Sequence, residues 1–181
     1  MIEEFTITVF SENSIGILNR ITINFTKRKL NIDSLTVSES AIKGVYKFTI
    51  VVKCALATVE NLVKQLDKQI DILRTFFLRE HEVLHQEMAM YKIETSTFLE
   101  SNQVEAIIRK HNARILEVTK EYTAIEKTGH KHETQELFEE LKPFGVLQFV
   151  RSGRVAITRL KKELLSEYLD KLEKREMSEE I

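Results

Sequence analysis

The sequence is poor in several residue types, and each shortage excludes a class of protein. Only one of its 181 residues is a cysteine, Cys54, so an intramolecular disulfide and a four-thiolate zinc site are both excluded. No run of about 18 apolar residues is present, which argues against a membrane-spanning helix. The first residues also lack the basic and apolar regions of a signal peptide. We therefore expect a soluble, cytoplasmic protein.

An excess of charge of one sign is missing as well. The 27 Lys and Arg residues nearly balance the 28 Asp and Glu residues, so the chain has no global basic field for nucleic acid or a membrane surface. With one proline and five glycines, few residues are available for irregular loops. Hydrophobic residues make up 43% of the chain, which is typical of a packed core.

The first half of the chain alternates strand and helix patterns. Strand patterns cover 4–10, 32–39, 45–53 and 71–79, and helical spacing of apolar residues covers about 18–29 and 57–69. Phe5, Ile7 and Val9 alternate with polar residues, which predicts a half-buried first strand. The order β-α-β-β-α-β predicts a ferredoxin-like domain, an antiparallel four-stranded sheet with both helices on one face.

The second half repeats this pattern. Strands are predicted at 88–97, 114–119, 122–127, 145–151 and 154–158, and helices at 102–111 and 133–141. The expected α+β architecture therefore has two ferredoxin-like domains. They cover 1–79 and 88–160, are joined by a polar linker at 80–87, and are followed by a charged helix at 161–181.

Two histidine motifs raise the question of metal chemistry. Residues 81–85 read His-Glu-Val-Leu-His, which on a helix would bind zinc with Glu82 as general base. The motif lies in the linker, however, and no third ligand stands out, so a polar linker is the simpler interpretation. His130 and His132 beside Glu133 are better explained as surface residues near a turn. We expect no catalytic residue and no metal site in this chain.

The turn after the first strand is a candidate binding site. Gly16 at the start of a helix lets a ligand approach the backbone, whose first N–H groups favour a carboxylate. Asn13 offers a donor and acceptors, and Asn31 and Ile32 begin the next strand at the edge of the sheet. Together these residues suit a zwitterionic amino acid. On spacing alone, an Asn13 that only caps the helix remains the simpler alternative.

Two long strings in this region resemble a known family. Residues 11–20 read Ser-Glu-Asn-Ser-Ile-Gly-Ile-Leu-Asn-Arg, and residues 25–37 read Phe-Thr-Lys-Arg-Lys-Leu-Asn-Ile-Asp-Ser-Leu-Thr-Val. They resemble the E-N-x-x-G-x-L-x-R and F-x-x-R-G-Y-N-I-x-S-L-T-V patterns of the ACT domain in the acetolactate (acetohydroxyacid) synthase small subunit. Segments 115–118, 126–129, 143–146 and 151–156 are similar to that family's C-terminal domain. Lys29 departs from the pattern, because the family has glycine there.

The resemblance implies a regulatory, non-catalytic subunit. Such a subunit activates a thiamine-diphosphate catalytic subunit and confers feedback inhibition by a branched-chain amino acid, typically valine. The chain itself would hold no cofactor, whereas the catalytic subunit would hold thiamine diphosphate, magnesium and FAD. A stand-alone ACT-domain sensor that controls another enzyme or regulator is the alternative.

The resemblance also implies where the effector binds. It assigns the effector to a homodimer interface between paired ACT domains, with one half of the site from each chain. One chain would supply Asn13 and Gly16, and the other Asn31 and Ile32. The residues that complete the implied site are Ser14, Ile15, Ile17 and Leu18.

Overall fold

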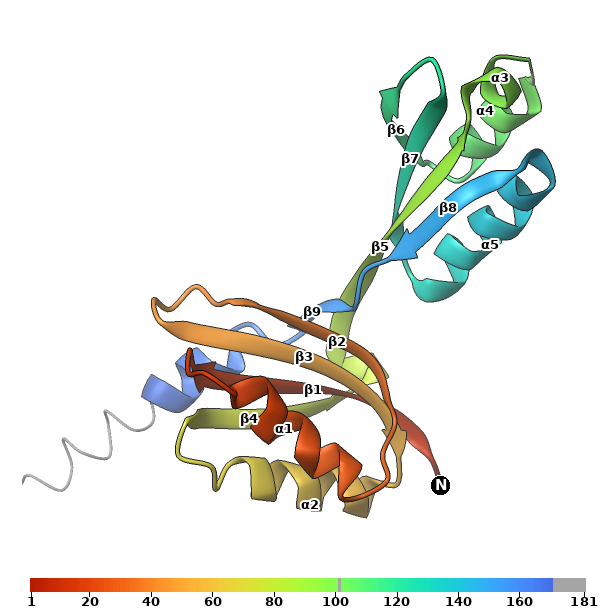
Figure 1. Ribbon diagram of the computed structural model, residues 1–181. Coiled ribbons are helices and arrows are strands. Elements are labelled where there is room, and N and C mark those ends of the chain that lie inside the picture. Colours follow the sequence, from red (N-terminus) through yellow and green to blue (C-terminus); the bar gives the residue numbers. More distant parts are fainter. Residues whose placement is uncertain (101, 171–181) are drawn as a thin grey trace, which may run out of the picture. The chain divides into compact units, whose positions relative to one another are not determined.

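The chain leaves its first structural unit and later returns to it. The structure, a computed structural model, describes residues 1–100 and 102–170 (Figure 1). Its N-terminal unit consists of Met1–Leu84 and the segment that starts at Arg154, and its C-terminal unit is His85–Gly153. Within the described residues, no helix is long and apolar enough to cross a membrane.

The N-terminal unit has the predicted ferredoxin-like fold. The strands are β1 (Glu3–Glu12), β2 (Ile32–Glu39), β3 (Val45–Cys54) and β4 (Ile72–Arg79). They form an antiparallel sheet in the order β2-β3-β1-β4. The helices α1 (Ile17–Thr26) and α2 (Leu56–Leu66) both lie on one face of this sheet (Figure 1).

The core of this unit lies between the sheet and the two helices. Phe5, Ile7 and Val9 of β1 point toward the helices and are completely buried against Ile21 of α1 and Leu62 of α2. Burying a large apolar side chain stabilises the fold by about 1.5–3 kcal/mol. The alternating apolar residues of β1 and the helically spaced apolar residues of α1 and α2 therefore pack in one core.

The opposite face of β1 is buried too, which differs from the half-buried strand that its alternation predicts. Thr6, Thr8 and Phe10 point away from the helices, yet they are only 1%, 5% and 1% exposed. The returning segment covers this face, and it begins with Arg154 and the short strand β9 (Val155–Thr158). The prediction was wrong because the covering residues are distant in the sequence.

The C-terminal unit repeats the order of elements. The strands β5 (Val83–Glu94), β6 (Arg114–Val118), β7 (Tyr122–Gly129) and β8 (Val146–Arg151) pair antiparallel in the order β6-β7-β5-β8, and β9 also pairs with β5. The helices are α3 (Thr95–Glu100), α4 (Asn102–Lys110) and α5 (Lys131–Leu141). Tyr91, Val104 and Leu137 are among the buried side chains between this sheet and its helices. The second βαββαβ pattern is thus confirmed.

Three segments differ from their expected limits. The linker expected at 80–87 is one 3-10 turn, η1 (Glu80–Glu82), because β5 already starts at Val83. The strand expected at 154–158 is present as β9, but it belongs to the N-terminal unit and not to a domain at 88–160. The helix expected at 161–181 starts at Leu164, and its part beyond Asp170 lies outside the described residues.

Candidate functional site

The candidate site is the turn that joins β1 to α1. Four residues separate Glu12, the end of β1, from Ile17, the start of α1. The Ser14 N–H donates to the Glu12 carbonyl at 3.1 Å, and the Ile17 N–H donates to the Ser14 carbonyl at 3.2 Å. Gly16 has a φ of 82°, in the left-handed region that glycine adopts without strain. In the part of the chain that the structure describes, no atom beyond the two chain neighbours lies within 4 Å of the position that a Cβ at Gly16 would take, so the backbone there is open to a ligand.

Arg20 holds this turn in place. Its guanidinium donates to the Ser14 hydroxyl at 2.7 Å and forms an ion pair with Asp71. The Glu12 N–H donates to the Asp71 carbonyl at 3.0 Å, so the segment before β4 supports the turn from both ends. The spacing of residues in the sequence does not reveal this role of Arg20. The signal that could have found it is the E-N-x-x-G-x-L-x-R pattern, of which Arg20 is the last residue.

The start of α1 carries the partial positive charge of its free backbone N–H groups. Among the described residues, no side chain caps this helix, and its first turn contains no acidic residue. The N–H groups of a first helical turn lack intrahelical acceptors and attract anions. Gly16 occupies the cap position, so Asn13 is not the cap, and the capping alternative for its side chain is wrong. Asn13 is the first residue of the turn, and it is exposed.

The apolar residues of the candidate site differ in accessibility. Ile15 is fully exposed and Leu18 is 45% exposed, so both side chains can meet a ligand or a partner. Ile17 is only 7% exposed and belongs to the core under α1. Its side chain therefore packs the helix, and only its backbone faces the turn.

The two halves of the expected site lie at opposite ends of the unit. Gly16 precedes α1 and Asn31 follows it, and the ten residues of α1 span about 15 Å. The register of the sheet also places the two halves apart. Ile32 pairs with Val52, and Val52 pairs on its other side with Phe5, near the start of β1, whereas the Gly16 turn follows the end of β1. One chain therefore does not bring Asn31 and Ile32 to the Gly16 turn.

β2, which begins with Ile32, is an edge strand of the four-stranded sheet. Its last residue, Glu39, pairs with Tyr46, and Tyr46 pairs with Ser11 just before the turn. The end of β2 thus lies at the same end of the sheet as the Gly16 turn, and its start lies at the other. Val37, near the end of β2, is 41% exposed.

The zinc-protease interpretation of residues 81–85 is wrong. His81 lies in the 3-10 turn η1 and His85 lies on strand β5, so the motif is not on a helix. Glu82 accepts a hydrogen bond from the Arg79 N–H at 2.8 Å and thereby closes the turn. In the described part of the chain, no three or more His, Cys, Asp and Glu residues are arranged to hold a metal ion.

The second histidine motif caps a helix. The His130 N–H donates to the Glu133 carboxylate at 2.6 Å at the start of α5. This hydrogen bond is the main reason that the pKa of Glu133 lies below its usual value. The His130 ring stands edge-on to that of His85, with 4.8 Å between their centroids. The carboxylate thus already has a structural role.

Comparisons with known proteins cover nearly the whole chain. Residues 7–74 match the family model for an AHAS small subunit-like ACT domain, and residues 86–160 match the model for the small subunit of acetolactate synthase. The acetolactate synthase small subunit of Bacillus subtilis is 34% identical over 154 residues, which cover 84% of this chain and 89% of that protein. The chain belongs to the acetolactate synthase small-subunit family. This confirms the resemblance seen in residues 11–37.

Other members of the acetolactate synthase small-subunit family agree. The acetolactate synthase small subunit of Aquifex aeolicus is 31% identical over 158 residues, covering 87% of this chain and 82% of that one. The crystal structure of the Thermotoga maritima small subunit has the same fold, with a TM-score of 0.79 and 24% identity, and the match covers 88% of this chain and 99% of that one. As a small subunit, the chain has a regulatory role in branched-chain amino-acid biosynthesis and a catalytic large subunit as its partner.

Proposed function

We propose that this subunit activates the catalytic subunit and makes it sensitive to a branched-chain amino acid, with valine as the expected effector. The Gly16 turn carries the proposal, because it is exposed, uncapped and held by Arg20. The effector carboxylate would accept hydrogen bonds from the first N–H groups of α1. The amide oxygen of Asn13 would accept from its ammonium, and Ile15 and Leu18 would contact its aliphatic side chain.

We further propose that the complete site needs two chains. If two copies pair antiparallel through their β2 edges, the start of one β2 lies opposite the end of the other. Because the end of β2 lies near the Gly16 turn, this pairing brings Asn31 and Ile32 of one chain to Asn13 and Gly16 of its partner. The separation of the two halves within one chain supports this arrangement.

The regulatory signal would be a change in the pairing of the ACT domains. An effector that contacts both chains stabilises one arrangement of the pair over others. The catalytic subunit would sense this preference as a coupling free energy of about 1–3 kcal/mol. Because such coupling is reciprocal, binding of the catalytic subunit should change the affinity for the effector by the same factor.

Replacing Gly16 tests the site. Gly16→Asp places a carboxylate where the effector carboxylate is expected, so feedback inhibition of the reconstituted holoenzyme should be abolished while activation is kept. Gly145→Asp is the matched control, because Gly145 has the same φ of 82° and equally open surroundings but lies in the C-terminal unit. Inhibition that survives in Gly16→Asp would show that the site is assigned to the wrong turn.

A stand-alone amino-acid sensor remains the alternative function. A sensor of this kind should form no stable complex with the catalytic subunit of acetolactate synthase. Mixing the two purified subunits and measuring both complex formation and the increase in acetolactate production separates the two functions. A complex with raised activity supports the regulatory subunit, and the absence of both supports the sensor.

A further inference from the structure

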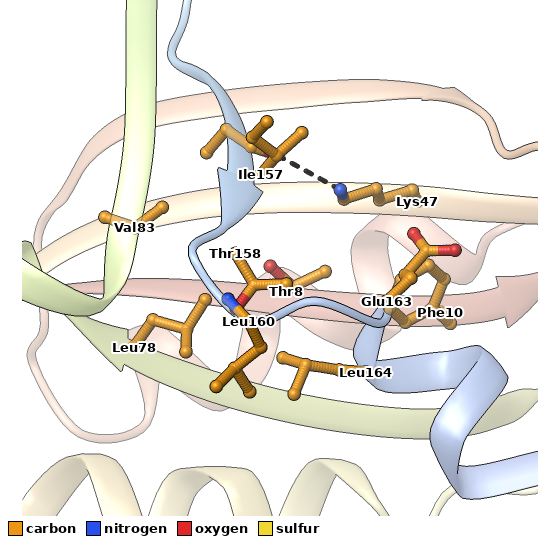
Figure 2. A pocket seen from close by; sticks show the side chains of 11 residues that line it. Thr8, Phe10, Lys47, Leu78, Val83, Ile157, Thr158, Leu160, Glu163 and Leu164 are labelled. Atoms are coloured by element: carbon orange, nitrogen blue, oxygen red, sulfur yellow. Dashed lines mark hydrogen bonds between the residues drawn. The ribbon is translucent and has the colours of Figure 1, made fainter.

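A pocket lies on the face of the N-terminal sheet opposite α1 and α2. Its volume is about 230 Å³, and the returning segment closes it against β1, β3 and β4 (Figure 2). All of its lining residues belong to the N-terminal unit. They are Thr8, Phe10, Lys47, Leu78, Val83, Ala156, Ile157, Thr158, Leu160, Glu163 and Leu164.

The walls of the pocket are mainly aliphatic. Leu78, Val83 and Leu164 form one apolar cluster at its side. Ile157 and Leu160 are 59% and 57% exposed, so they stand at the mouth and leave it open to solvent. The volume lies below the roughly 300–1,000 Å³ that drug-sized ligands occupy. A nucleotide or a large cofactor is therefore too big, and a small aliphatic molecule fits.

Two groups of opposite charge line this apolar space. Lys47 of β3 donates to the Ala156 carbonyl at 3.1 Å, and an ammonium group has two further N–H donors (Figure 2). Glu163 comes from the returning segment, and among the described residues none forms a hydrogen bond or ion pair with its carboxylate. A ligand with only a carboxylate would meet Lys47 but would also face the like charge of Glu163. A zwitterion satisfies both groups.

We propose that this pocket binds a small aliphatic α-amino acid, with its carboxylate at Lys47, its ammonium at Glu163 and its side chain against the aliphatic wall. The site is separate from the Gly16 turn, which lies at the start of a helix on the other face of the sheet. The ligand would touch β3 through Lys47 and the returning segment through Glu163. Binding therefore stabilises the docking of that segment on the sheet.

The test uses the full-length chain with Gly16→Asp, so that the turn cannot contribute. Titration calorimetry with leucine should show one saturable site per chain. Adding Lys47→Met or Glu163→Gln should weaken this binding about tenfold to a hundredfold, because each removes a charge-assisted hydrogen bond. The 2-oxo acid analogue of leucine lacks the ammonium, so it should also bind about tenfold or more weakly.

Lys53→Met is the matched control, because Lys53 lies on the same strand, is exposed and does not line the pocket. It should leave leucine binding unchanged. Adding leucine should slow amide hydrogen exchange in residues 154–164 of Lys53→Met. It should not slow this exchange in Lys47→Met.

Two results would overturn the proposal. One is no binding of leucine by the Gly16→Asp chain at millimolar concentrations, and the other is binding that Lys47→Met and Glu163→Gln leave unchanged. Neither result bears on the proposed effector site at the Gly16 turn, because that site is tested by feedback inhibition of the holoenzyme. Conversely, inhibition that survives Gly16→Asp would refute the turn and leave the pocket standing.

Discussion

At the scale of single residues, Arg154 joins the returning segment to the sheet. Its side chain is 8% exposed, and its guanidinium donates to Glu4 at 2.6 Å and to Thr6 at 2.9 Å. Its backbone N–H donates to the Ser34 hydroxyl at 2.8 Å, and its carbonyl accepts from the Thr36 hydroxyl at 2.9 Å. A buried charge with these partners is costly to leave half satisfied, because the groups that remain lose their compensation.

Replacing Arg154 should loosen the outer face of the sheet. In Arg154→Met we expect amide hydrogen exchange in β1 and in 154–160 to rise about tenfold to a hundredfold, because the half-buried Glu4 and the buried Thr6 lose this donor. Arg114→Met is the control. Arg114 lies at the same 2.6 Å from Glu126, but its side chain is 74% exposed, and exposed pairs contribute little. Peptide-resolved mass spectrometry measures the exchange around each substituted residue. An equal increase in exchange around Arg114 and around Arg154 would contradict the stabilising role of Arg154.

Tyr91 makes the C-terminal unit sensitive to alkaline pH. Burial raises the pKa of Tyr91 to about 12, and its hydroxyl donates to the Thr134 carbonyl at 2.6 Å. In the unfolded chain, a tyrosine titrates near 10. Because the folded pKa is the higher one, this stabilisation is fully present below about pH 10 and is lost as the pH rises to about 12.

The measurement compares the wild type with Tyr91→Phe. The free energy of unfolding of the C-terminal unit should fall more steeply in the wild type between about pH 10 and 12. Parallel profiles of the two proteins over this range would show that Tyr91 titrates normally.

At the scale of elements, the proposed pairing of two copies involves an edge of the N-terminal sheet. β2 and β4 are the two edges of the N-terminal sheet. Val37 of β2 is 41% exposed, so this edge strand presents an apolar side chain. An unpaired strand edge of this kind favours pairing with another strand. The proposed dimer uses this edge.

A charge on β2 should therefore weaken the dimer. Val37→Asp should raise the dissociation constant at least about tenfold, because the carboxylate would be desolvated in the pairing. Leu73→Asp is the control, since Leu73 lies on β4 at the opposite edge and is similarly exposed, at 38% against 41%. Sedimentation equilibrium gives both constants. A dimer that is weakened only by Leu73→Asp would point to the β4 edge.

At the scale of the whole molecule, the N-terminal unit is built from two stretches of sequence. The stretch before β5 forms the sheet and its helices, and the stretch from Arg154 covers the outer face of the sheet. Leu165, fully buried against Phe10 and Val45, extends this cover toward the end of the hairpin between β2 and β3. The stability of the first unit thus depends on the end of the described chain.

Removing the second stretch should affect the N-terminal unit and leave the helices of the C-terminal unit unchanged. A chain that ends at Gly153 exposes Thr8 and Phe10, so hydrogen exchange in β1 should accelerate. Peptides of α4 and α5 should exchange as in the full chain, because their unit keeps all its residues. An unchanged β1 in the shortened chain would mean that the returning segment does not stabilise the sheet.

Most of the fold was predictable because it follows from local periodicity. Alternation in β3 and helical spacing in α2 reflect which side chains meet the core, and this information lies within about ten residues. The Gly16 turn was found for the same reason, since its glycine and the following helix are adjacent in sequence. The limits of the linker were not predictable in this way. The early start of β5 depends on pairing with β9, because β7 pairs with β5 only from Glu87 and β8 only from Ala89.

The order of residues alone settles the two βαββαβ repeats, the family and the turn at Gly16. Only the tertiary structure reveals why both faces of β1 are buried, how Arg20 supports the turn, and that Lys47 and Glu163 share a pocket. The physical reason is distance along the chain. Arg154 and Thr6 are 148 residues apart yet share a hydrogen bond, and no local pattern of polarity encodes such a contact.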